Sequence, residues 1–264
     1  ASDIICRGET MQQNDFDLKT KTALNELKNA IEQSSRIAVL TGAGVSVPSG
    51  IPDFRSATGL YATSVGKYRA EDIISHDFFM LRPDDFYAFY KSKMCYPNAE
   101  PNAMHFLLAR LEKAGKINAV VTQNIDGLHQ KAGSERVCEL HGSVWRNYCE
   151  RCGKSFSLDY VLQADGTPHC DCGGIIKPDV VLYGENLDEK VLRNSVRAIS
   201  TADLFIVIGT SLVVYPAAGL VNYFGGNTIA LVNKSATYID SRADIVINQD
   251  CEKVAKWLDE NLVL

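Results

Sequence analysis

The chain lacks the features of several protein classes. None of its apolar runs approaches the roughly 20 residues that a helix needs to cross a bilayer, so we expect no membrane partner. It shows no internal repeat and no low-complexity tract, and its first residues lack the basic, apolar and small segments of a signal peptide. Positive charge is not in excess, since the net charge is −5, and we expect no direct nucleic-acid partner.

What is present is ordinary for a globular protein. The 264 residues are 46% hydrophobic and 22% charged, which excludes a wholly disordered, collagen-like or coiled-coil chain. Eight cysteines are present, and four of them lie between Cys149 and Cys172 as two close pairs. Without a signal peptide, such clustered pairs indicate reduced, metal-binding thiols rather than disulfides. We therefore expect a cytoplasmic protein.

Short apolar runs alternate with segments of helical periodicity. The runs are continuous rather than alternating, as in strands buried on both faces of a parallel sheet; they cover residues 36–40, 119–122, 203–209, 227–233 and 244–248. Helical spacing occupies residues 18–31, 102–114, 187–200, 216–224 and 252–262. This alternation predicts an α/β fold with a Rossmann-like, doubly wound parallel sheet.

Two stretches interrupt this alternation of predicted strands and helices. Residues 52–101 are rich in aromatic and turn residues and are expected to contain no strand, and residues 142–176 carry the cysteine pairs. Residues 1–10 precede Met11, which we expect to be the natural start, with a native unstructured tail as the alternative. The expected organisation is a tail (1–17), a Rossmann-like domain (18–51, 118–141 and 177–264), a cofactor-loop and helical insert (52–117) and a zinc-binding module (142–176).

A glycine-containing turn directly follows the first predicted strand. Gly42 and Gly44 flank Ala43, and glycines at this place let backbone N–H groups approach a phosphate. The motif falls short of the full dinucleotide fingerprint because Val47 stands where the third glycine belongs. A plain tight turn is the alternative.

The loop that follows combines an acid, an aromatic residue and an arginine. In residues 50–55, Arg55 is suited to a phosphate and Phe54 to a flat ring. This loop is expected to fold over a ligand. A surface loop with a local salt bridge is the alternative.

Polar side chains also follow other predicted strands at their carboxyl ends, where open α/β sheets bind ligands. Those near the second strand could hold ribose hydroxyls and an amide, although Asn and Asp could equally cap a helix there. The candidates are Gln123, Asn124, Ile125, Asp126, Gly209, Thr210, Ser211 and Asn233. Cys251, at the start of the last helix, could meet an adenine edge through its backbone or could simply be buried.

One histidine and four cysteines complete the set. His141 precedes a glycine that permits close approach of a ligand, and it is the best general-base candidate of five histidines, with a structural role as the alternative. Thiolates in two close pairs suit one tetrahedral, structural zinc. The second pair has a single intervening residue, and His169 could replace a thiolate; the four cysteines are Cys149, Cys152, Cys170 and Cys172.

Together these motifs resemble those of one protein family. They occur in the order found in sirtuins, from about Leu18 to the C-terminus, and are most similar to bacterial members; they read GAGVS, GIPDFR, TQNID, ELHG, the cysteine pairs, KPDVVLYGE, GTSL and LVN. The resemblance implies an NAD-dependent protein-lysine deacylase with NAD as co-substrate, one structural zinc and an acyl-lysine protein or peptide as partner. It gives no oligomeric state.

The resemblance also implies residue roles. His141 would be the general base, and Asn124, with Gln123, would hold the nicotinamide ribose. Ile125 and Asp126 would recognise the nicotinamide amide. Phosphate and ribose contacts would come from the turn and loop, that is Gly42, Ala43, Gly44, Val47, Phe54 and Arg55, and adenosine contacts from Gly209, Thr210, Ser211, Asn233 and Cys251. An acyl-lysine peptide would lie as an added strand between Val181, Leu182, Tyr183 and Gly184 on one side and Val213 and Val214 on the other.

Two departures from the family pattern bear on activity. Val47 replaces a frequent threonine, which removes a hydroxyl near the phosphates. Sirtuins that remove succinyl groups carry Tyr-x-x-Arg in the acyl pocket, whereas here Tyr90 is followed by Lys93. Lysine lacks the bidentate fork that grips a carboxylate, so we expect deacetylation or apolar deacylation first, unless Lys93 points into solvent. A mono-ADP-ribosyltransferase and a non-catalytic NAD or ADP-ribose sensor are the alternative functions.

Overall fold

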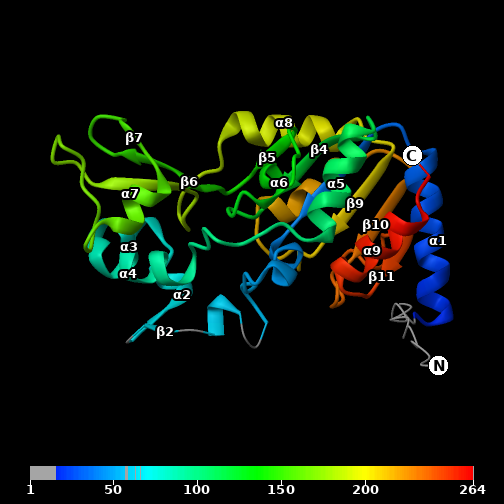
Figure 1. Ribbon diagram of the computed structural model, residues 1–264, viewed down its shortest axis with the longest axis horizontal. Helices are drawn as coiled ribbons and strands as arrows, with labels where there is room; N and C mark the ends of the chain where they lie inside the picture. The colour runs from blue at the N-terminus through cyan, green and yellow to red at the C-terminus, as the bar shows by residue number, and fades with distance from the viewer. Residues whose placement is uncertain (1–15, 57–58, 63, 66, 264) are drawn as a thin grey trace, which may run out of the picture.

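The computed structural model describes residues 16–56, 59–62, 64–65 and 67–263, and it shows two bodies side by side (Figure 1). The larger body carries the main sheet, and the smaller one contains both interrupting stretches of the sequence. The expected start at Met11 lies outside the described residues. None of the helices in the described ranges is long and apolar enough to cross a membrane.

The larger body is built on a parallel sheet. Within the described residues it has six strands in the order β11-β10-β9-β1-β4-β5. All five predicted apolar runs are strands, namely β1 (Ile37–Thr41), β4 (Ile117–Thr122), β9 (Leu204–Ile208), β10 (Thr228–Val232) and β11 (Ile245–Ile247). The sixth strand, β5 (Val137–Glu139), was not predicted. Every residue of β1 and β9 is buried, which explains their continuous apolar sequences.

Helices cover both faces of this sheet, which confirms the doubly wound fold. One face is packed by α1 (Leu18–Gln33), α5 (Ala103–Lys113) and α9 (Cys251–Asn261). The other face is packed by α8 (Glu189–Ser200) and by η4 (Ala217–Tyr223), which is a 3₁₀ helix rather than the α-helix expected over 216–224. Asp17 is the N-cap of α1, and its side chain accepts a hydrogen bond from the Thr20 backbone. Phe16, the residue before it, is buried against the core.

The smaller body combines the two interrupting stretches. The second stretch supplies an antiparallel sheet of β6 (Gly142–Cys149), β7 (Ser155–Phe156) and β8 (Ile176–Val180), with α7 (Leu158–Gln163). The first supplies α2 (Ala70–Ile73), α3 (His76–Leu81) and α4 (Pro83–Lys93). The expectation that residues 52–101 contain no strand is wrong, because β2 (Ser64–Val65) and β3 (Tyr68–Arg69) pair there as a short hairpin.

A single apolar core joins these two stretches. Phe79, Phe86 and Tyr87 from the helices form an edge-to-face aromatic cluster. The same buried cluster contains Val144 and Leu158 from the second stretch. We therefore propose one α/β domain and one small domain that takes both inserts.

Candidate active site

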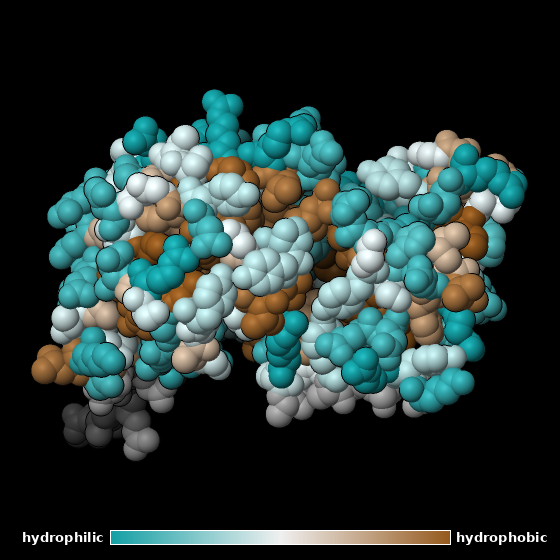
Figure 2. All heavy atoms as spheres, turned by 180° about the vertical axis from the view of Figure 1, so that it is seen from behind, coloured by the Kyte–Doolittle hydropathy of each residue, from teal (hydrophilic) through white to brown (hydrophobic). Residues whose placement is uncertain are grey.

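A cavity of about 480 Å³ lies between the two domains, at the carboxyl ends of the sheet strands. Seen from behind, the surface between the domains is hollowed and carries apolar side chains (Figure 2). The structure brings twenty of the predicted residues into the cavity wall: Gly42, Ala43, Gly44, Val47, Phe54, Arg55, Gln123, Asn124, Ile125, His141, Val181, Leu182, Tyr183, Gly184, Gly209, Thr210, Ser211, Val214, Asn233 and Cys251. Residues from distant parts of the sequence therefore meet at one place.

Four predicted residues lie outside that wall. Tyr90 is fully buried in the aromatic core of the small domain, and Lys93 is exposed at the end of α4. The next residue, Met94, lines the cavity instead. Val213 is 53% exposed, and the carboxylate of Asp126 is engaged by neighbouring chain atoms. The structure thus agrees with the alternative in which Lys93 points into solvent.

The glycine turn after β1 packs tightly against the turn after β9. A Cβ at Gly44 would lie 2.8 Å from the Cα of Gly209, and one at Gly42 would lie 2.6 Å from the Cβ of Thr210. The Gly44 N–H also donates to the Gly209 carbonyl at 2.8 Å. Both glycines are therefore required by the contact between two strand ends.

Asn124 is held in a buried polar network at the end of β4. Its Nδ2 donates to the Gly42 carbonyl at 3.1 Å and to the Ser46 hydroxyl at 3.0 Å. The Ser46 hydroxyl in turn donates to the Asp126 carboxylate at 2.6 Å. Burial raises the pKa of Asp126, and the hydrogen bond from Ser46 opposes that shift. This network fixes the orientation of the Asn124 amide at the cavity wall.

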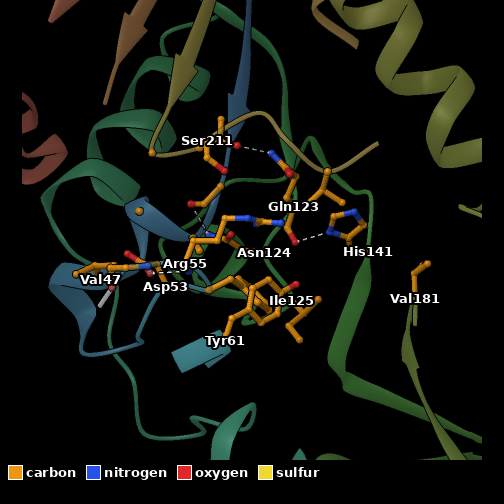
Figure 3. Close-up of a pocket in the computed structure, with 18 of the residues that line it drawn as sticks. Val47, Asp53, Arg55, Tyr61, Gln123, Asn124, Ile125, His141, Val181 and Ser211 are labelled. Atoms are coloured by element: carbon orange, nitrogen blue, oxygen red, sulfur yellow. Dashed lines mark hydrogen bonds between the residues drawn. The ribbon is translucent and has the colours of Figure 1, made fainter. Parts of the chain in front are cut away.

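His141 is oriented by the backbone of β4. Its Nδ1 lies 3.0 Å from the Gln123 carbonyl, which can only accept, so the ring proton is on Nδ1 and Nε2 is free to take a proton (Figure 3). Burial lowers the pKa of His141, so the ring is neutral at pH 7. The following Gly142 has φ +75°, and a Cβ there would lie 1.9 Å from the Asp179 carbonyl. The ring is therefore placed by a turn that only glycine permits.

The small domain supports this region through a contact that the motifs did not indicate. The Trp145 indole on β6 donates from Nε1 to the Asp126 carbonyl at 2.7 Å. Gly127 has φ +76°, and a Cβ on it would lie 2.8 Å from the Trp145 ring. Other wall residues that were not predicted include Asp53, Tyr61, Ile74, Met94, Tyr215 and Lys234. Asp53 lies within the GIPDFR motif, and Val180, Glu185 and Val232, which also line the cavity, lie within the KPDVVLYGE and LVN motifs, so these four could have been indicated by a motif.

The four cysteines form the predicted cluster at the other end of the small domain. Their Sγ atoms all lie within 4.8 Å of one another, and the Cys149–Cys172 and Cys152–Cys170 pairs are 3.4 Å and 3.6 Å apart. A tetrahedral zinc with bonds of about 2.3 Å places thiolates roughly 3.8 Å apart, so the cluster fits this ion. His169 is directed instead to the Thr167 carbonyl. Four thiolates leave no open coordination position, so the zinc is structural.

The fold and the site together define a nucleotide-binding α/β protein whose small domain carries four cysteines that fit one zinc ion. The chain belongs to the Sir2 family, whose model matches residues 42–216. It is similar to the NAD-dependent protein deacetylases of Clostridium acetobutylicum (57% identity) and Clostridium perfringens (54%), in each case over 88% of this chain and 96% of the relative.

Solved structures show the same similarity. A structure described as Sir2 bound to acetylated peptide matches with a TM-score of 0.80 and 40% identity, over 90% of this chain and 97% of that one. One described as Sir2-p53 peptide-NAD+ matches with a TM-score of 0.80 and 42% identity, over the same shares. The sirtuin fold predicted from the motifs is therefore confirmed.

Replacing Cys172 with Ser tests the metal site. We expect the bound zinc to fall well below one ion per chain and the thermal midpoint to drop, because the binding energy of a structural zinc is also folding energy. Elemental analysis and thermal melting measure both. His169→Ala is the matched control and keeps its zinc. Zinc retained in Cys172→Ser but lost in His169→Ala would contradict the four-cysteine assignment.

Proposed function

We propose that this chain is an NAD-dependent protein-lysine deacylase with deacetylation as its main activity. The observation that carries this is the meeting of His141, Asn124 and Gln123 in one cavity at the strand ends. Similar chains are named NAD-dependent protein deacetylases, and a structural neighbour holds a peptide and NAD+. The products are free lysine, nicotinamide and O-acyl-ADP-ribose.

We assign the two ends of NAD to different parts of the wall. The nicotinamide and its ribose would lie against Asn124 and Ile125, with Asp126 directly behind. Gln123 would hold the nicotinamide ribose together with Asn124. The phosphates and the adjoining ribose would be held by Gly42, Ala43, Gly44, Val47, Phe54 and Arg55, and adenosine by Gly209, Thr210, Ser211, Asn233 and Cys251. This division follows the order in which the strand ends line the cavity.

The residues of the chain then act on the bound substrates. NAD supplies a ribose carbon that becomes electrophilic as nicotinamide leaves. Asn124, held by Gly42 and Ser46, orients that ribose. The acyl oxygen of the peptide would bond to that ribose carbon as its bond to nicotinamide breaks. The free Nε2 of His141 would then take the proton of a ribose hydroxyl, and that hydroxyl oxygen would bond to the acyl carbon. The bond from the acyl carbon to the lysine nitrogen then breaks, and a water molecule displaces the original acyl oxygen from the acyl carbon, which leaves O-acyl-ADP-ribose. The peptide would lie between Val181, Leu182, Tyr183 and Gly184 and the segment with Val213 and Val214, next to this base.

The wall also favours an apolar acyl group. Ile74, Met94, Ile125 and Leu182 line the cavity, whereas Lys93 is exposed outside it. Burying a carboxylate beside these side chains without a paired cation is costly. None of the seven cysteines in the described part of the chain forms a disulfide, and four of them would hold zinc as thiolates. Reduced cysteines are typical of a reducing compartment, and we propose the cytoplasm.

Nicotinamide release from NAD with matched acetyl-lysine and succinyl-lysine peptides tests the function. We expect peptide-dependent release with loss of the acetyl group, and at least roughly tenfold slower release with the succinyl peptide, because an unpaired buried carboxylate is costly. Mass spectrometry of the peptide identifies the product. ADP-ribose attached to protein would favour a transferase, and NAD binding without release would favour a sensor.

His141→Ala and Asn124→Ala test the two catalytic assignments. We expect both to abolish turnover, with NAD binding largely retained, because each removes one group from a wall with many other contacts. Calorimetric NAD titration and deacetylation rates separate the two effects. His76→Ala is the control, since the His76 ring is exposed, does not line the cavity and lies beside Asp77. Turnover close to that of the wild type in either test variant would exclude the role assigned.

The pH dependence tests the base independently. Burial lowers the pKa of His141, so the neutral ring persists below its usual pKa of about 6.5 and is lost as pH falls through the lowered value. We expect kcat/KM to fall in acid with an apparent pKa below 6.5. Circular dichroism over the same range is the control, because His105 and His129 are also buried and must become charged on acidification. If kcat/KM of the folded protein falls in acid with an apparent pKa above 6.5, the assignment of His141 as the base is contradicted.

A further inference from the structure

Two tyrosine hydroxyls meet across the cavity. Tyr61 follows the GIPDFR loop, and Tyr183 belongs to the segment that follows β8. Their hydroxyl oxygens are 2.6 Å apart, and both side chains line the cavity. Figure 3 shows Tyr61 and Arg55 on one side of the cavity and Val181 on the other. The bond therefore joins the two walls.

On one side, Tyr61 moves together with the loop. Its backbone N–H donates to the Phe54 carbonyl at 2.8 Å, and its ring packs edge-on to Phe54 with centroids 5.6 Å apart. The Arg55 guanidinium lies 5.1 Å above the same ring. The loop of residues 50–55 would contact NAD. Any displacement of this loop therefore also displaces the Tyr61 hydroxyl.

On the other side, Tyr183 is fixed to the wall where the acyl-lysine would lie. Its N–H donates to the Ile74 carbonyl at 3.0 Å, and its carbonyl accepts from the His76 N–H at 2.9 Å. Two residues earlier, Val181 donates to the carbonyl of His141. Tyr183 is 40% exposed, and its hydroxyl reaches across the cavity to that of Tyr61.

We propose that the Tyr61–Tyr183 hydroxyl pair is a positioning link through which the cofactor and the acyl peptide strengthen each other's binding. This inference rests on the proposed deacylase function. A ligand that orders one wall holds the hydroxyl that orders the other, so the second ligand loses less conformational entropy on binding. The coupling is reciprocal by thermodynamic linkage. Neither tyrosine touches the reacting atoms in this account.

Binding of an acetyl-lysine peptide, measured by calorimetry with and without saturating ADP-ribose, tests the link. ADP-ribose lacks the nicotinamide leaving group and does not react. We expect ADP-ribose to tighten peptide binding by roughly 2- to 12-fold in the wild type, the range that one neutral hydrogen bond supplies. In Tyr183→Phe and in Tyr61→Phe, which keep both rings, this factor falls to near one.

Tyr160→Phe is the matched control. Its hydroxyl donates to the His169 carbonyl at 2.9 Å, and Tyr160 is not part of the cavity wall. In this control, ADP-ribose tightens peptide binding as much as in the wild type. If ADP-ribose does not tighten peptide binding in the wild type, or tightens it equally in the wild type and both test variants, the link is overturned while the deacylase function stays intact. A wild type that binds ADP-ribose but no acetyl-lysine peptide overturns the proposed function and the link with it.

Discussion

The close contact between two strand ends is the constraint on which the site depends. Gly42 and Gly44 after β1 interlock with Gly209 and Thr210 after β9, with no space for additional side-chain atoms. The groups that line the cavity are attached to this contact. Asn124 bonds to the Gly42 carbonyl, Gln123 donates to the Thr210 hydroxyl at 3.0 Å, and the Cys251 thiol donates to the Gly44 carbonyl at 3.4 Å. A shift of one turn would therefore displace the ends of β4 and α9 as well.

The second structural principle is that two inserts make one domain. Buried side chains of both stretches belong to one aromatic core, so each stretch is packed against the other. This domain is then joined to the sheet next to the cavity. Arg146 on β6 bonds to Glu139 of β5 at 2.6 Å and to Asp179 of β8 at 2.7 Å. These ion pairs tie β5 of the sheet to β6 and β8 of the small domain. The Val181 N–H donates to the His141 carbonyl at 3.0 Å, so the base lies directly beside the wall that would bind the peptide.

The sequence contained much of the fold because continuous apolar runs and glycine turns are local signals. Prediction from the sequence failed for features that depend on contacts between distant parts of the chain. β5 is short, only half-buried and includes a glutamate, so nothing in its sequence distinguishes it from a loop. The shared core joins segments far apart in the chain, which no periodicity reports. The resemblance to sirtuins assigned Tyr90 and Lys93 to the acyl pocket, with an exposed Lys93 as the alternative. In the structure, Tyr90 is buried in the aromatic core, Lys93 is exposed at the end of α4, and Met94, the next residue, lines the cavity. The Tyr61–Tyr183 pair links two loops, and its geometry is visible only in three dimensions.

The indole contact to the turn after β4 has a practical consequence. The chain contains two tryptophans, and one of them, Trp145, is hydrogen-bonded to the backbone beside the cavity. The other, Trp257, belongs to α9 and packs against the core of the sheet domain. The two indoles therefore have different surroundings: a movement of the turn after β4 would change the environment of Trp145, whereas that of Trp257 depends on the packing of the larger domain.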